Sequence, residues 1–133
     1  MKRYAILYAA TLAVLLPLDF LFLGVLAKDF FKSQVGGALG EVNVLAAVTF
    51  YLLYPIGIVI FVSAAAGSSL QHTLIYGALF GLFCYATFDL TALALLKGWT
   101  WPAAILDISW GAGATASSAT RGLIIANAIQ RQV

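Results

Sequence analysis

Three aspartates interrupt long apolar stretches of this sequence, and two of them have an aromatic residue at helical spacing. Asp89 lies in YATFDLTALALLKGWTW, one helical turn after Tyr85, and Asp107 precedes Trp110 by three residues. Asp19 ends the segment LLPLD in the first stretch. An acidic residue in lipid costs on the order of 2.5–3.5 kcal/mol at a helix centre, so such residues mark proton, ion or ligand sites. Carboxyl and aromatic groups together would suit a proton, a hard cation, an amine or a polar head group.

The composition of the chain predicts the elements that position these residues. Of 133 residues, 63% are hydrophobic and 9% are charged, far fewer charges than soluble domains carry. Each apolar run is long enough for a helix of about 20 residues to cross a membrane, and none alternates as barrel strands do. We therefore predict an all-α integral membrane four-helix bundle, a single transmembrane domain over residues 1–133. Its predicted spans are 4–27, 42–66, 74–96 and 102–129.

The three acids are predicted to share one depth in the membrane. Asp19 lies eight residues before Ala27, the end of its span, and Asp89 lies eight residues before Lys97, just past the end of its span, so each is about 12 Å below one membrane face. Asp107 lies five residues after Pro102, roughly 8 Å below the same face. Tyr51, in the second span, reaches a similar depth. All four helices therefore contribute to one polar layer.

Two plainer roles for these acids remain open from the sequence. A buried aspartate can be protonated and hydrogen-bonded to Tyr or Thr as a link between helices, or it can pair with Lys28 or Lys97 reaching inward. Removal from water favours the uncharged carboxyl, so we expect Asp89 to be wholly or partly protonated at neutral pH. Three acids at one depth favour a polar site over three separate links.

Small residues indicate how the helices pack. GALFG in the third span is a G-x-x-x-G pattern, and GAGATASSAT gives the fourth span a nearly continuous small surface. Such surfaces let helix backbones approach closely in lipid. They are expected to pack the bundle; the alternative is an interface with a membrane-protein partner or a second copy of the chain.

The positive charges favour cytoplasmic termini by about one charge. Lys2, Arg3, Arg131 and Arg121 belong to the terminal side, and three lysines to the other. Arg121 is expected to snorkel toward the terminal side. The connection KDFFKSQVGGALGEVN mixes charge with phenylalanine, as a segment lying at the membrane interface would.

The chain resembles a bacterial family of small four-helix membrane proteins, catalogued as a domain of unknown function, number two-one-seven-seven. The resemblance rests on PLDFLFLG, FYLLYPIG, GALFGLFCYATFDLTALALLKGW and LDISWG, in the four spans in order. It implies a stand-alone multi-pass protein of the bacterial inner membrane and implies no reaction. The positions that match the family's pattern are Asp19, Tyr54, Tyr85, Asp89, Thr91, Lys97, Trp99, Asp107 and Trp110.

Three classes of function fit the sequence. The first is a site that binds or conducts a proton, a cation or a polar head group; the second is an accessory or assembly subunit of a larger membrane complex. The third is a membrane-lipid-modifying enzyme with Asp as general acid or base. Enzymatic activity is disfavoured, because the chain lacks histidine clusters, Ser/His or Cys/His pairs and Cys-x-x-Cys. The sequence identifies no cofactor, and we predict neither a metal site nor nucleic-acid binding. The expected main partner is the lipid bilayer.

Overall fold

The protein is all-helical in a computed structural model that describes residues 2–38, 43–65 and 69–131. Helix accounts for 92% of the structure, and no strand occurs in these ranges. The α-helices are α1 (Lys2–Leu21), α2 (Lys28–Val35), α3 (Val44–Ile58), α4 (Leu70–Leu95) and α5 (Trp101–Arg131). Helix α1 continues as a π-helical segment at Phe22–Leu26, α2 ends in a 3₁₀ turn at Gly36–Ala38, and α3 continues as a π-helical segment at Val59–Ser63.

Three of the helical segments are long and apolar enough to cross a membrane. They are Lys2–Leu26, Val44–Ser63 and Leu70–Leu95, close to the predicted 4–27, 42–66 and 74–96. Positions 42 and 66 lie outside the described residues. Helix α4 begins four residues earlier than predicted, because the Ser69 side chain accepts a hydrogen bond from the His72 backbone N–H at 3.3 Å and caps it.

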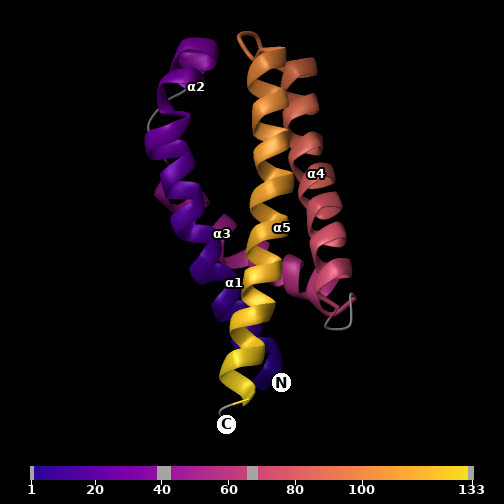
Figure 1. Ribbon diagram of the computed structural model, residues 1–133. Helices are drawn as coiled ribbons and strands as arrows, with labels where there is room; N and C mark the ends of the chain where they lie inside the picture. The colour runs from indigo at the N-terminus through magenta and orange to yellow at the C-terminus, as the bar shows by residue number, and fades with distance from the viewer. Residues whose placement is uncertain (1, 39–42, 66–68, 132–133) are drawn as a thin grey trace.

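The predicted fourth span, 102–129, forms the longest helix but is less apolar than the other three. Helix α5 lies against both α4 and α1 (Figure 1). Its small residues face these neighbours, so lipid meets only part of its circumference and the helix can carry Gly, Ser and Thr inside the protein. The buried residues of α5 are Ala103, Ala104, Gly111, Ala114, Thr115, Ala116, Ser118, Ala119, Gly122, Leu123 and Ala126.

The four-helix count of the prediction omits α2. The connection predicted to lie at the interface forms an eight-residue helix, with Asp29 in its first turn and Lys32 in its last. This placement complements the helix dipole. The structure therefore has five α-helices in its described residues, of which one is short.

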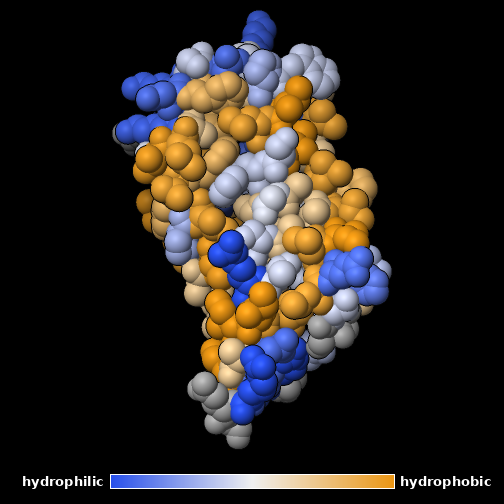
Figure 2. Space-filling model, in the orientation of Figure 1, coloured by the Kyte–Doolittle hydropathy of each residue, from blue (hydrophilic) through white to orange (hydrophobic). Residues whose placement is uncertain are grey.

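The two chain ends lie at the same end of the molecule (Figure 1). Helix α4 also starts toward this end, whereas α2 and the turn between α4 and α5 lie at the opposite end. At the end that holds the termini, Arg3 of α1 donates to Asn127 of α5 at 2.9 Å and also bonds to Gln130. The outer surface is largely hydrophobic (Figure 2), as lipid contact requires.

Candidate functional site

The close approach of α4 and α5 fixes the geometry of the site. A Cβ atom on Gly81 would lie 2.2 Å from the backbone oxygen of Gly111, and one on Gly111 would lie 2.1 Å from Cγ of Tyr85. A Cβ on Gly77 would lie 2.8 Å from Cα of Ala116. The expectation that the small residues pack the bundle is therefore met within the chain itself. Whether they also meet a partner or a second copy stays a prediction.

Asp89 and Asp107 form a carboxyl pair across this helix contact. Asp89 is fully buried, and its carboxyl lies within hydrogen-bonding reach of that of Asp107. An ionised carboxylate only accepts hydrogen bonds, so a bond between two carboxyl groups requires at least one proton. The indole Nε1 of Trp99 donates to Oδ1 of Asp89 at 3.3 Å. Asp89 Oδ2 receives no hydrogen bond from an N–H or hydroxyl group of the described residues.

The turn after α4 brings Trp99 back onto Asp89. Gly98 adopts a φ of 88°, in the left-handed region that a glycine enters at little cost. The chain thereby reverses directly after Lys97, and the Trp99 ring meets Phe88 edge-on at a centroid distance of 5.6 Å. Trp99, rather than Lys97, is the residue beyond α4 that contacts Asp89.

Asp19 holds α1, α3 and α5 together beside this pair. Tyr51 of α3 donates its hydroxyl to Oδ2 of Asp19 at 2.8 Å, and Trp110 of α5 donates Nε1 to Oδ1 at 2.8 Å. Asp19 is 3% exposed. The Trp110 ring stacks on Phe22, with centroids 4.2 Å apart and planes 4° apart. The predicted polar layer therefore divides into a carboxyl pair and a separately bonded Asp19.

A cavity of about 450 Å³ opens beside the carboxyl pair. Asp107, which is half-buried, is the one acidic residue among the described residues that line it; the walls come from α3 and α4. Phe50 and Phe88 are 39% and 56% exposed, so the cavity reaches the lateral surface of the protein. The hydroxyls of Tyr54 and Thr115 hydrogen-bond at 2.7 Å and join α3 to α5 nearby. The lining residues are Phe50, Tyr54, Cys84, Tyr85, Phe88 and Asp107.

Not every candidate residue reaches the carboxyl groups. Thr91 is exposed and donates its hydroxyl to the backbone oxygen of Thr87 at 2.5 Å. Lys97 is exposed and has no ion pair with a described residue. Tyr85 lines the cavity with its ring packed on Gly111, and no hydrogen bond joins it to a carboxyl of the described residues.

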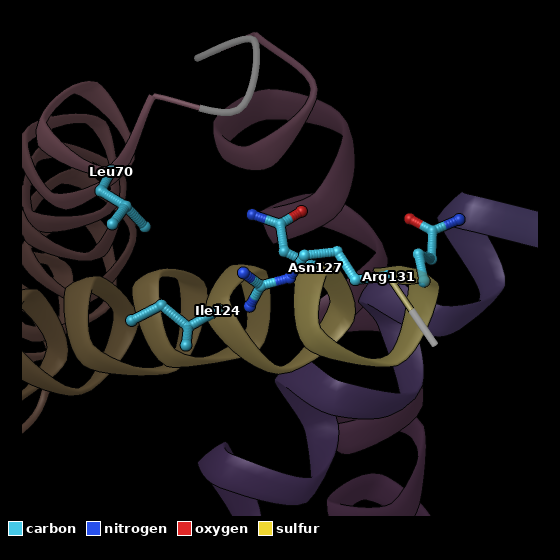
Figure 3. Close-up of a pocket in the computed structure, with 5 residues that line it drawn as sticks. Leu70, Ile124, Asn127 and Arg131 are labelled. Atoms are coloured by element: carbon cyan, nitrogen blue, oxygen red, sulfur yellow. The ribbon is translucent and has the colours of Figure 1, made fainter. Parts of the chain in front are cut away.

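A second hollow, of about 550 Å³, lies at the end of the chain termini (Figure 3). Asn127 and Arg131 project from α5 on one side of it, and Leu70 lies across from them. None of its described lining residues carries a carboxyl group. The described residues hold no group of three or more His, Cys, Asp or Glu suited to a metal ion.

The sequence of residues 4–124 matches the model of the family described as "Predicted membrane protein (DUF2177)". The chain belongs to this family. The match spans all three acids and the whole cavity lining. No curated protein and no solved structure matches the chain. Membership of the DUF2177 family supports a multi-pass membrane protein, in agreement with the three apolar helices.

Sequence reasoning missed four residues that shape this site in the DUF2177 chain. Phe22 stacks on Trp110, Thr115 bonds to Tyr54, Phe50 lines the cavity, and Gly98 turns Trp99 inward. Only Gly98 had a local signal, because a glycine directly after the last helical turn is a common helix stop. The others depend on which helix faces share a contact.

Proposed function

We propose that this protein is a four-span protein of the bacterial inner membrane, with cytoplasmic termini, that binds a cationic group beside the Asp89–Asp107 pair. The single observation that carries the proposal is the close approach of these two carboxyls at the wall of the aromatic cavity. With one shared proton the pair holds one negative charge. A monovalent cation at Asp107 would balance that charge.

The lining favours an organic cation over a bare metal ion. Tyr54, Tyr85 and two phenylalanines supply ring faces, which attract ammonium groups. A hard metal ion would need six to eight oxygen ligands, and the lining offers one carboxyl. Since the cavity reaches the lateral surface, the ligand enters from the lipid. The proposed ligand is an amine or quaternary ammonium head group on an apolar tail.

The positions of the chain ends support the four-span topology. Three apolar helices and α5 return both termini to one end (Figure 1). Helix α5 can cross the membrane although it is less apolar, because α4 and α1 cover its small residues. The slight excess of positive charge at the termini favours that end as the cytoplasmic side.

The test compares a fluorescent long-chain quaternary ammonium with its uncharged analogue, using purified protein in lipid nanodiscs. We expect at least about tenfold tighter binding of the cation, about 1.4 kcal/mol. Asp107→Asn should remove this preference. Asp29→Asn is the matched control, since Asp29 is exposed in α2, outside the three apolar segments. Equal binding of both probes, or an unchanged preference in Asp107→Asn, would overturn the proposal.

The lateral opening also favours a second candidate function, modification of a membrane lipid. A carboxyl pair that shares a proton can give or take one, so Asp107 would serve as general acid or base at a lipid head group. Comparing lipid extracts by mass spectrometry from cells making the wild type and Asp107→Asn tests this. A lipid species whose abundance changes with the wild type alone would support the enzyme; identical lipid profiles would argue against it.

A further inference from the structure

Arg121 places a positive charge on the lipid-facing side of α5. Its side chain is exposed and lines a hollow of about 440 Å³ between α1 and α5. Figure 2 shows hydrophilic side chains surrounded by hydrophobic ones midway along this face of the molecule. The other lining residues are all apolar: Val14, Pro17, Leu18, Ile124 and Ile125.

This hollow lies near mid-membrane. Val14 is the midpoint of the apolar segment Lys2–Leu26, so its surroundings are about 15 Å from either face of a hydrocarbon core about 30 Å thick. Gly122, next to Arg121, is level with Thr11: a Cβ on Gly122 would lie 2.6 Å from the Thr11 Oγ1 atom. The hollow extends from Ile124 and Ile125, nearer the termini than Arg121, to Pro17 and Leu18 on the other side.

The expected snorkelling of Arg121 toward the terminal side stays a prediction, although the helix sets the start of this side chain in the other direction. Helical side chains lean toward the N-terminus of their helix, and α5 runs toward the terminal end. The Arg121 side chain therefore leaves α5 toward the membrane interior. Lipid tails offer it no hydrogen bond, and an arginine at a helix centre costs on the order of 2.5–3.5 kcal/mol.

The described part of this chain supplies no acid to balance Arg121. Arg121 has no ion pair there, and no acidic residue lines the hollow. Asp19, Asp89 and Asp107 are engaged inside the protein, and Asp29 lies beyond the end of the first apolar segment. A second copy would present Asp19, Asp89 and Asp107 engaged in the same way, which favours a different molecule as the source of the balancing carboxylate.

We propose that the hollow around Arg121 is a docking surface for a transmembrane helix of another protein that carries Asp or Glu near mid-membrane. The planar guanidinium can bond a carboxylate with two parallel N–H groups. The apolar walls fit the remaining side chains of a spanning helix. A lipid phosphate is the weaker alternative, because head groups lie outside the hydrocarbon core. This inference does not depend on the cation site.

Model helices of defined charge test the docking surface. The protein is labelled with a donor dye at Ser33→Cys in a Cys84→Ser background and placed in vesicles of zwitterionic lipid. The acceptor-labelled probes are leucine-rich transmembrane peptides with one central Glu, Gln or Lys. Energy transfer should show at least about tenfold stronger association of the Glu peptide than of the Gln peptide. Arg121→Gln should abolish that difference.

Two further variants keep the test decisive. Arg121→Glu should transfer the preference to the Lys peptide, a result that loss of folding cannot produce. Lys97→Gln, which removes an exposed cation at the end of α4, should leave the Glu preference intact. Equal association of Glu and Gln peptides with the wild type would overturn the proposal. Loss of the Glu preference when anionic phosphatidylglycerol is added would also overturn it and assign Arg121 to a lipid phosphate.

Discussion

The indole N–H of Trp110 on α5 donates a hydrogen bond of 2.8 Å to the carboxyl of Asp19 on α1. The same ring stacks on Phe22. One side chain thus satisfies a buried acid and fills the space between two helices. Asp19 can be buried because Trp110 and Tyr51 replace the hydrogen bonds that water would give it.

Trp110→Phe separates these two contributions. The phenylalanine keeps an aromatic ring against Phe22 but removes the donor to Asp19. We expect a loss of about 1–3 kcal/mol in the free energy of unfolding, the cost of leaving a buried acceptor unpaired. Denaturation in mixed micelles measures it. In the Asp19→Leu background the same change should cost less, and equal costs in both backgrounds would show that the hydrogen bond does not stabilise the fold.

Gly81→Ala should separate α4 from α5. The added Cβ would overlap the Gly111 backbone oxygen and the Thr115 hydroxyl, and backbone cannot move aside cheaply. We expect about 1–3 kcal/mol of destabilisation, as for overpacking in a core. Gly113→Ala is the control, because no atom lies within 4 Å of a Cβ at that position. Gly113→Ala should be neutral or slightly stabilising, and equal thermal shifts in the two variants would contradict the packing argument.

The helices were predictable because lipid requires long apolar segments with all backbone groups bonded internally. Hydropathy alone placed Asp19, Asp89 and Asp107 at one depth. It could not give the direction in which each side chain points, so the pairing of Asp89 with Asp107 and the separate position of Asp19 came only from the structure. The shift from α- to π-helical geometry at Phe22–Leu26 and Val59–Ser63 also lacks a residue signal and changes the faces that follow.

The α4–α5 packing was the most predictable contact. GALFG identified two glycines one turn apart, and the partner surface GAGATASSAT was equally evident. The cavity was less predictable, because Phe50 and Phe88 belong to helices that are apolar on all sides. Nothing in such a helix distinguishes a lipid-facing ring from a cavity wall.

The orientation of the chain can be tested by cysteine labelling. In a Cys84→Ser background, Ser33→Cys reports on α2 and Gln71→Cys on the start of α4; both positions are exposed. Gln71 is preferable to Ser69, which caps α4. A membrane-impermeant maleimide added outside spheroplasts should label position 33 and spare position 71. The reverse pattern would place the termini in the periplasm.

Binding of a quaternary ammonium probe should weaken as the pH falls. The probe has no proton to lose, so pH acts through the protein. At low pH a second proton neutralises the Asp89–Asp107 pair and competes with the cation; at higher pH the pair keeps its negative charge. Competition by one proton gives up to a tenfold loss of affinity per pH unit. Titrations in nanodiscs over a pH series check this, and a flat profile would mean that the pair does not hold the cation.

Infrared spectroscopy on isotope-labelled aspartate can detect the proton between Asp89 and Asp107 directly. We expect a protonated carboxyl band at neutral pH that is lost in Asp107→Asn, because the amide N–H then donates to Asp89 and no proton is needed. This variant should stay folded, as should Asp89→Asn, which places an amide opposite Asp107. Asp89→Leu removes the acceptor of the Trp99 indole and leaves Asp107 without its partner. It should therefore loosen the bundle and lower the melting temperature by several degrees more than Asp89→Asn. Only ionised-carboxylate bands in the wild type at neutral pH would contradict the shared proton, and a bound cation would then have to hold the two carboxyls together.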